Sequence, residues 1–217
     1  MILIILLLVI LFVVFFIIRP MFLKPDTCVL FVGGLGSGKS LISVKKSLQL
    51  LRRQRFRVRW YNRFHPKNPR PKPLLYSTIP VRISRKEYSV PLDDLTPVLA
   101  KKVVPRSVVF FDEVSLWLDQ MTLKPKNAEQ IEEFCTLFRH YSKGGFIVLN
   151  TQNTSKVNFR VRYCLNRAYH LAEFRKIWHF YWVKCRDLSL IDDEKSINVG
   201  SLTDSYKTLF GFIPFST

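Results

Sequence analysis

The chain has 217 residues, of which 48% are hydrophobic and 23% charged, and its 34 basic and 16 acidic residues give a formal net charge of +18. The length suits a single α/β domain, and the charge favours an anionic partner such as nucleic acid or a membrane surface. The four cysteines have no paired spacing, so we expect reduced thiols rather than disulfides or a zinc site.

Residues 1–18 form an apolar run without a charged side chain. As a helix, this run would span about 27 Å, which is enough for the hydrocarbon core of a bilayer. A cleaved signal peptide is the alternative, but such peptides carry basic residues before the apolar stretch, whereas Arg19 and Lys24 follow it here. Because Lys and Arg lie only on the C-terminal side, we predict a single transmembrane anchor over residues 1–23, with the rest of the chain in the cytoplasm.

A glycine-rich loop follows the first predicted strand. Residues 27–32 (TCVLFV) are apolar and rich in β-formers, which predicts a buried strand, and residues 33–40 (GGLGSGKS) fit the pattern G-x-x-x-x-G-K-[ST]. Leu41, Val44, Leu48 and Leu51 then recur at helical spacing. A mobile glycine turn is the alternative, but a strand, a glycine loop and a helix in this order are the context that a phosphate-binding loop requires.

The residue types of this loop suit the phosphates of ATP. Glycines lack Cβ, so backbone N–H groups can form a nest around an anion, and the following helix directs its positive end toward it. Lys39 supplies a full positive charge to the β and γ phosphates, and the Ser40 hydroxyl is a ligand for Mg²⁺. We assign ATP binding to Gly33, Gly34, Leu35, Gly36, Ser37, Gly38, Lys39 and Ser40.

Two adjacent carboxylates end a second apolar run. Residues 107–111 (SVVFF) predict a strand buried on both faces, and Asp112 and Glu113 follow at its carboxyl end, where open α/β sheets bind ligands. We predict that Asp112 shares Mg²⁺ with Ser40 and that Glu113 polarises the attacking water. An ordinary acidic turn is the alternative, which the glycine loop upstream disfavours.

Many basic residues lie between Lys45 and Lys72, where they are interleaved with the aromatic residues Phe56, Trp60, Tyr61 and Phe64. Three interpretations stay open for this segment. It contacts DNA phosphates, it lies on anionic lipid head groups, or it is a solvated face without a partner. The choice between them depends on how the segment folds.

The remaining pattern alternates strands with helices, which predicts a mostly parallel sheet. We expect strands over residues 74–79 and 146–149 and a helix over residues 128–141, with Asn150, Thr151 and Gln152 following the second strand. From Tyr163 onward, alternating residues predict a C-terminal β-hairpin whose aromatic side chains pack rather than stack on bases. The tail over residues 201–217 has no clear pattern of regular structure.

Four segments together carry a family resemblance, namely GGLGSGKS, LLYSTIP, VVFFDEVSLWL and LFRHYSKGGFIVLNTQ. Over roughly residues 27–185, the chain resembles the zonula occludens toxin-like family, the assembly ATPases of filamentous phages. It is also similar to the genome-packaging ATPases of tailless, membrane-containing icosahedral viruses. The resemblance implies that Gln152 is a sensor beside the γ-phosphate and that Arg139 is a finger reaching a neighbour's nucleotide. Without it, Gln152 reads as a strand cap and Arg139 as a partner of the helix dipole.

We therefore expect an α/β P-loop NTPase domain over residues 24–200, with a mostly parallel sheet flanked by helices and a C-terminal β-hairpin, between the anchor over residues 1–23 and the tail over residues 201–217. The resemblance implies an ATP hydrolase that uses ATP and Mg²⁺ and forms a homo-oligomeric ring. It would move phage or viral DNA, or a DNA–coat complex, at the host inner membrane, with DNA and viral coat or capsid proteins as partners.

Three alternatives to this function stay open. Genome packaging for a membrane-containing icosahedral virus, with the protein in the virion membrane, is an alternative of the same class. A nucleotide kinase would need an acceptor pocket and a lid, and neither an anchor nor a charge of +18 is expected of it. A non-catalytic scaffold that binds nucleotide at the membrane is the third.

Overall fold

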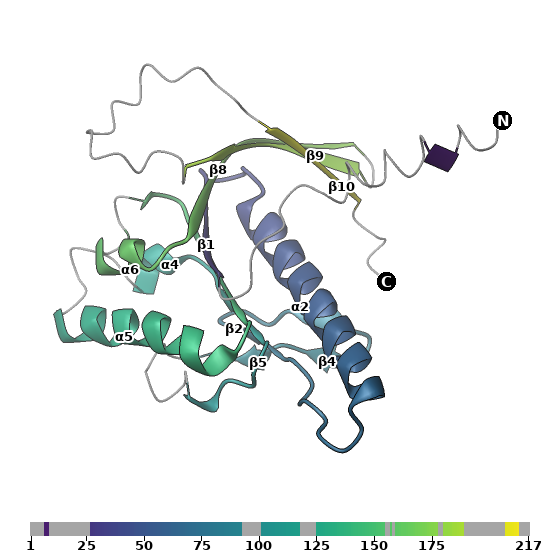
Figure 1. The fold of residues 1–217 in the computed structure, drawn as a ribbon. Helices are drawn as coiled ribbons and strands as arrows, with labels where there is room; N and C mark the ends of the chain where they lie inside the picture. Colours follow the sequence, from purple (N-terminus) through teal and green to yellow (C-terminus); the bar gives the residue numbers. More distant parts are fainter. Residues whose placement is uncertain are drawn as a thin grey trace.

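A mixed β-sheet forms the centre of the molecule. The computed structural model describes residues 7–8, 27–92, 101–117, 125–154, 157, 159–177, 180–188 and 207–212. Within them, the main sheet has eight strands in the order β10-β9-β8-β1-β7-β6-β2-β5 (Figure 1). The strands are β1 (Thr27–Val32), β2 (Leu75–Ser77), β5 (Val90–Pro91), β6 (Val108–Phe111), β7 (Phe146–Thr151), β8 (Arg167–Ile177), β9 (Phe180–Asp187) and β10 (Lys207–Phe212). The six neighbouring strands β8, β1, β7, β6, β2 and β5 are paired in parallel, whereas β9 is antiparallel to both of its neighbours, β8 and β10. The predicted mostly parallel sheet is therefore confirmed.

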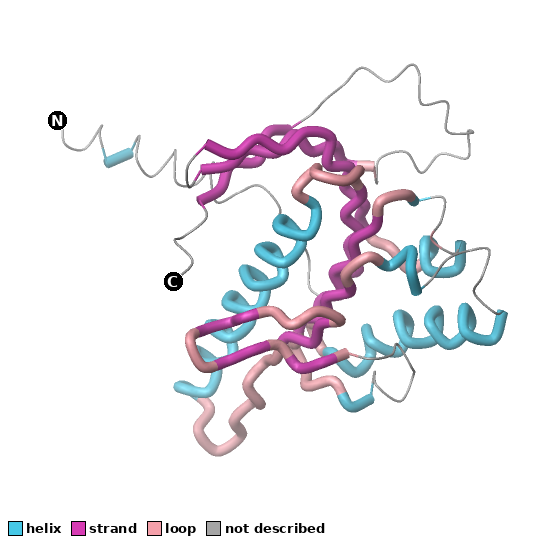
Figure 2. The backbone as a smooth tube through the Cα atoms, turned by 180° about the vertical axis from the view of Figure 1, so that it is seen from behind, coloured by secondary structure: helices cyan, strands magenta, loops and turns pink. Residues whose placement is uncertain are grey.

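Helices cover both faces of this sheet. α2 (Lys39–Phe64) lies along one face, and α4 (Val114–Trp117), α5 (Pro125–Ser142) and α6 (Phe159–Tyr163) lie on the other (Figure 1). The view from behind in Figure 2 shows the same layers. Neighbouring residues of β1 point to opposite faces, so Phe31 packs in the core cluster shared with α2 and Leu30 packs with Phe134 and Phe138 of α5. Because both faces are covered, β1, β6 and β7 each contain an uninterrupted apolar run of at least four residues.

The helix after the glycine loop differs from its predicted form. It runs to Phe64, well beyond the apolar pattern, because arginine is a good helix former and the chain meets no proline before Pro66. Of the four residues predicted to face the core, Leu51 is fully buried, whereas Leu41 is 36% exposed. The buried face instead carries the polar residues Ser43, Ser47 and Gln54 besides Ile42, Leu50 and Val58.

Each of these buried polar residues makes at least one internal hydrogen bond, although Gln54 Oε1 has no partner among the described residues. The Ser43 and Ser47 hydroxyls donate to the carbonyl oxygens of Lys39 and Ser43, each over 2.8 Å. Gln54 Nε2 donates to the Gly144 carbonyl oxygen over 2.8 Å. A buried polar group that keeps a hydrogen bond costs little, so the hydrophobic pattern alone marks only part of the buried face of α2, on which Val44 and Leu48 are partly buried against the core.

The later elements agree with the sequence except at the tail. The predicted strand over residues 74–79 and helix over 128–141 are confirmed as β2 and α5, and β8 and β9 form the predicted hairpin. A short two-stranded sheet pairs β3 (Arg82–Ser84) with β4 (Glu87–Tyr88). The expectation of a tail without regular structure is wrong for residues 207–212, which form β10 and pair with β9. Their partner strand offers open hydrogen-bonding groups at a sheet edge, which no local pattern reveals.

The predicted anchor over residues 1–23 lies outside the described part of the chain, apart from residues 7 and 8. Among the residues that the structure describes, no helix has both the length and the apolar character needed to cross a bilayer.

Candidate functional site

The glycine loop connects the carboxyl end of β1 to the first residue of α2. Its first N–H, from Gly33, donates to the Thr151 carbonyl oxygen over 3.2 Å, which ties the loop to β7. Gly36 and Gly38 have φ angles of 77° and 76°, in the left-handed region that favours glycine. The Gly38 carbonyl oxygen accepts the first helical hydrogen bond, from the Ile42 N–H over 2.9 Å. The loop therefore turns directly into the N-terminus of a long helix.

Strand β8 closes one side of this loop. A Cβ on Gly38 would lie 2.5 Å from the ring of Phe174, so the packing and the backbone angle both require glycine there. At the outer turn of the loop, Leu35 is 85% exposed.

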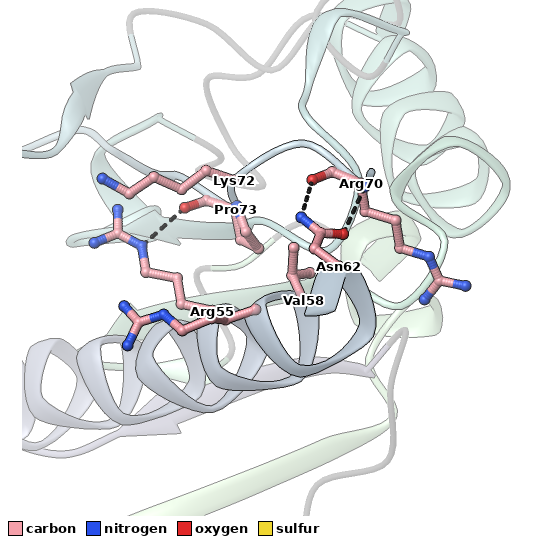
Figure 3. A pocket seen from close by; sticks show the side chains of 7 residues that line it. Arg55, Val58, Asn62, Arg70, Lys72 and Pro73 are labelled. Atoms are coloured by element: carbon pink, nitrogen blue, oxygen red, sulfur yellow. Dashed lines mark hydrogen bonds between the residues drawn. The ribbon is translucent and has the colours of Figure 1, made fainter. Parts of the chain in front are cut away.

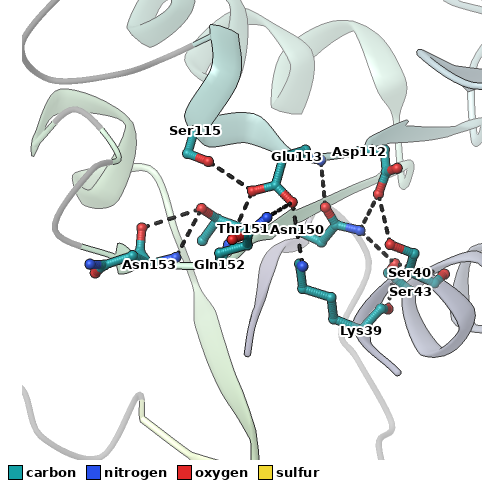
Figure 4. Close-up of polar contacts among 10 residues, drawn as sticks. All are labelled: Lys39, Ser40, Ser43, Asp112, Glu113, Ser115, Asn150, Thr151, Gln152 and Asn153. Atoms are coloured by element: carbon teal, nitrogen blue, oxygen red, sulfur yellow. Dashed lines mark hydrogen bonds and ion pairs between the residues drawn. The ribbon is translucent and has the colours of Figure 1, made fainter. Parts of the chain in front are cut away.

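The predicted phosphate and magnesium ligands lie together at one edge of the sheet (Figure 4). Lys39 is only 7% exposed, and its Nζ lies 3.4 Å from Oε2 of Glu113. The Ser40 hydroxyl donates to Oδ1 of Asp112 over 3.3 Å. Strand order explains this proximity, because β7 lies between β1 and β6 and all three parallel strands end at the same edge.

Asn150, at the end of β7, connects the two motifs. Its side chain is fully buried, and its Nδ2 donates both to Oδ1 of Asp112 and, over 3.1 Å, to Oγ of Ser43. Its Oδ1 accepts a hydrogen bond from the Glu113 N–H. Asn150 follows the strand predicted over residues 146–149, but its residue type alone predicts no role. A polar side chain ending a buried strand was the available signal.

Glu113 is held in an unusual backbone conformation. Its φ of 49° is uncommon for a residue with a side chain and is typical of functional positions. The carboxylate accepts hydrogen bonds from the Ser115 hydroxyl over 2.8 Å and from the Gln152 N–H over 3.1 Å. The Gln152 side-chain amide lies 3.5 Å from the same carboxylate. Gln152 therefore lies beside the predicted catalytic carboxylate.

These contacts set the charge of Glu113. Burial raises the pKa of its carboxyl, but the Ser115 hydrogen bond, the Lys39 charge and the Gln152 N–H together outweigh burial and keep the pKa below its ordinary value. The group is therefore an ionised hydrogen-bond acceptor at neutral pH.

Arg139 is not part of this cluster within one chain. It is exposed near the C-terminal end of α5, which leads into the start of β7, whereas the cluster lies at the other end of that strand (Figure 1). A strand of six residues separates the two positions by about 20 Å. Any contact between Arg139 and a nucleotide therefore requires a second copy, and its predicted role as a finger stays a prediction.

The cluster fits a nucleotide's phosphates with a divalent cation. Ser37, in the middle of the loop, is buried, and its hydroxyl oxygen has no hydrogen-bond partner among the described residues. A buried hydroxyl of this kind suits a bound oxyanion. The Ser40 hydroxyl and the Asp112 carboxylate are oxygen ligands of the type that Mg²⁺ prefers.

A comparison with protein-family models assigns the chain to a known family. The family model described as Zonular occludens toxin (Zot) matches residues 27–177. The comparison with curated proteins found no match.

Solved structures similar to the chain share little sequence with it. The N-terminal domain of zonular occludens toxin from Neisseria meningitidis is 16% identical, with a TM-score of 0.42 over 75% of this chain and 84% of that one. B204, the DNA-packaging ATPase from Sulfolobus turreted icosahedral virus, is 12% identical, with a TM-score of 0.44 over 76% and 98%. The flagellar accessory protein FlaH from Methanocaldococcus jannaschii is 10% identical, with a TM-score of 0.47 over 76% and 79%. At these identities, the likenesses do not carry the activities of those proteins over to this chain.

Proposed function

We propose that this chain, which belongs to the zonular occludens toxin family, is an ATPase that powers virion assembly by moving phage or viral DNA, or a DNA–coat complex, at the host inner membrane. The observation that supports the ATPase most strongly is the convergence of Lys39, Ser40, Asp112 and Glu113 at the carboxyl ends of β1 and β6. These are the residue types that hold phosphates, hold a divalent cation and activate water.

In this mechanism, the glycine loop and Lys39 bind the phosphates of ATP, while Ser40 and Asp112 would hold Mg²⁺. The cation, when bound, supplies charge neutralisation at the phosphate oxygens. Glu113 accepts a proton from the attacking water, and Gln152 lies beside it to orient that water. Asn150 keeps Asp112 and Glu113 in register through its hydrogen bonds to both.

The ion pair between Lys39 and Glu113 adds a control step to this mechanism. Without phosphates, the two charges neutralise one another across 3.4 Å. A γ-phosphate attracts Lys39 away from Glu113, and the loss of that positive neighbour raises the pKa of the carboxyl. Glu113 thereby becomes a stronger base only when its substrate is present.

Two substitutions test the ATPase. In full-length protein, Lys39→Ala should lose ATP hydrolysis, and Glu113→Gln should keep ATP binding but lose hydrolysis, because an amide is a poor base. Lys102→Ala, which removes an exposed lysine elsewhere, is the matched control. Wild-type turnover in Lys39→Ala would refute the site. Loss of binding in Glu113→Gln would make that residue structural.

Turnover measured with and without DNA separates the classes of function. A motor that moves DNA should hydrolyse ATP faster when DNA is present. A nucleotide kinase should instead transfer phosphate to an acceptor, and a scaffold should bind ATP without turnover. A rate of ATP hydrolysis that DNA does not change would contradict the proposal that DNA is the substrate that is moved.

The proposed location and assembly follow from the sequence. Residues 1–23 anchor the chain in the membrane with the ATPase domain in the cytoplasm, and copies form a ring in which Arg139 reaches a neighbour's nucleotide. Carbonate should fail to extract the full chain from membranes, and protease outside spheroplasts should leave the domain intact. Extraction of the full chain by carbonate would contradict the proposed anchor and would leave the proposed ATPase site untested by this result.

A further inference from the structure

The second half of α2 carries a row of exposed aromatic side chains. Phe56, Trp60 and Phe64 are 65%, 57% and 61% exposed and follow one another at intervals of four residues. Their neighbouring ring centroids are 6.4 Å and 5.3 Å apart. Single exposed apolar residues are ordinary on a protein surface, but a contiguous row of large ones marks an interaction site.

Basic side chains surround this row, and α2 contains no acidic residue. Arg52, Arg59 and Arg63 are exposed, and Arg53 and Arg57 are half-buried among them. Burial and the nearby charge of Arg57 lower the pKa of Arg53, as expected where like charges are crowded. We call the outward side of α2 from Arg52 to Phe64 the aromatic–arginine face. Its charge is complementary to an anionic surface.

A cationic pocket lies on the flank of this face, between α2 and the loop that follows it (Figure 3). Its volume is about 300 Å³, and it is lined by Arg55, Val58, Arg59, Asn62, Arg70, Lys72 and Pro73. The Asn62 side chain is clamped to the backbone N–H and carbonyl of Arg70, over 2.8 Å and 2.9 Å, which fixes the loop to the helix. Glu87 pairs with Arg55 and Lys72, whereas the other two cations of the lining are Arg59 and Arg70, whose guanidinium lies over the Tyr61 ring. The remaining positive charge suits a phosphate group.

The topology places this end of α2 beside the start of the described domain. Gln54 donates to the carbonyl of Gly144, just before β7, and Thr27 pairs with Phe146 at the start of β7. Gln54 and Thr27 therefore lie at the same edge of the sheet, opposite the glycine loop. Residues 19–26 extend over at most about 28 Å, so an anchor within residues 1–18 would hold the aromatic–arginine face close to the bilayer.

We propose that the aromatic–arginine face, with the cationic pocket beside it, docks onto an anionic phospholipid bilayer; only the closeness of this face to the bilayer rests on the proposed anchor. The aromatic rings enter the interface between head groups and acyl chains, and the arginines and the pocket bind lipid phosphates. A bilayer fits better than a nucleic acid, because the three rings pack against one another along the helix and leave no gap for a base to enter. The docking would orient the nucleotide site away from the membrane.

Photocrosslinking tests this surface in the full chain. The photoreactive residue p-benzoylphenylalanine replaces Trp60, and as a control it replaces Tyr163, which is 84% exposed on α6 across the sheet. Each protein is inserted into phosphatidylcholine vesicles with or without phosphatidylglycerol, and single-stranded DNA is added to parallel samples. We expect lipid crosslinks from position 60 that increase with phosphatidylglycerol, and none from position 163.

Removing positive charge should weaken the docking. With the photoreactive residue at position 60, Arg59→Gln and Arg63→Gln should each lower the lipid crosslink about fivefold in anionic vesicles. Crosslinks from position 60 to DNA, or to a second copy, in place of lipid would overturn the proposal. A protein that resists carbonate extraction yet gives no lipid crosslink at position 60 would overturn the docking and leave the anchor. Lipid crosslinks from a protein that carbonate extracts would support the docking and refute the anchor.

Discussion

Substitution of Asn150 should destabilise the whole domain, because this buried amide joins the two motifs of the site. In Asn150→Ala, the Glu113 N–H loses its acceptor and the Asp112 carboxylate loses a donor. Ser43 is affected less, since its hydroxyl also donates to the Lys39 carbonyl. The variant therefore breaks contacts between β6 and β7 and leaves the apolar core in place.

The magnitude follows from the groups left without partners. An unsatisfied buried N–H costs about 1–3 kcal/mol, and a lost hydrogen bond to a charged group costs about 1.5–3 kcal/mol. Asp112 keeps the Ser40 hydroxyl, and its own N–H still donates to Oγ1 of Thr78, so the lower half of each range applies. We expect a loss of about 3 kcal/mol in the free energy of unfolding, or about 10 °C in Tm for a domain of this size.

Thermal unfolding followed by circular dichroism measures this loss. Asn68→Ala is the matched control, because Asn68 is exposed in the loop after α2, and such substitutions change stability by less than about 0.5 kcal/mol. Asn150→Asp adds a diagnostic, since it keeps an acceptor for Glu113 but sets a second carboxylate against Asp112. Mg²⁺ should then raise its Tm more than that of the wild type. A Tm for Asn150→Ala within about 2 °C of the control would refute the reasoning.

Three further predictions follow from the same contacts. Gly38→Ala should weaken ATP binding at least tenfold in a nucleotide titration, because its Cβ meets the Phe174 ring and its φ is 76°; wild-type affinity would show that the loop tolerates both strains. The hydrogen bonds and charges of Arg55 and Lys72 lower the pKa of Glu87 to about 2. The ion pairs of Glu87 therefore stabilise the fold above pH 4.5, and this stabilisation is lost as the pH falls from 4.5 toward 2. Glu87→Gln should accordingly unfold at a Tm that depends less on pH in this range, and an unchanged slope would contradict the ion pairs. Arg139→Ala should bind ATP but hydrolyse it poorly, and mixing it with Lys39→Ala should restore part of the activity if the finger acts between copies. Loss of ATP hydrolysis that mixing does not restore would mean that Arg139 acts only within its own copy.

The nucleotide loop and the two carboxylates could be predicted from the sequence because their constraints are local. Glycines at positions 36 and 38 meet positive φ angles within the loop itself, and the apolar runs before the loop and before Asp112 reflect strands covered on both faces. The mostly parallel sheet follows from the same alternation of strands and helices.

The tertiary structure alone decided which distant residues complete the site. Asn150 contacts Ser43 and Asp112 across 107 and 38 residues of sequence, and only the position of β7 between β1 and β6 brings them together. The same holds for the buried polar face of α2 and for β10, whose partners lie far along the chain. A pattern of hydrophobic residues indicates which side chains are buried away from water. It does not report which hydrogen-bond partner a buried polar group will find, because that depends on strand order and on the packing of elements distant in sequence.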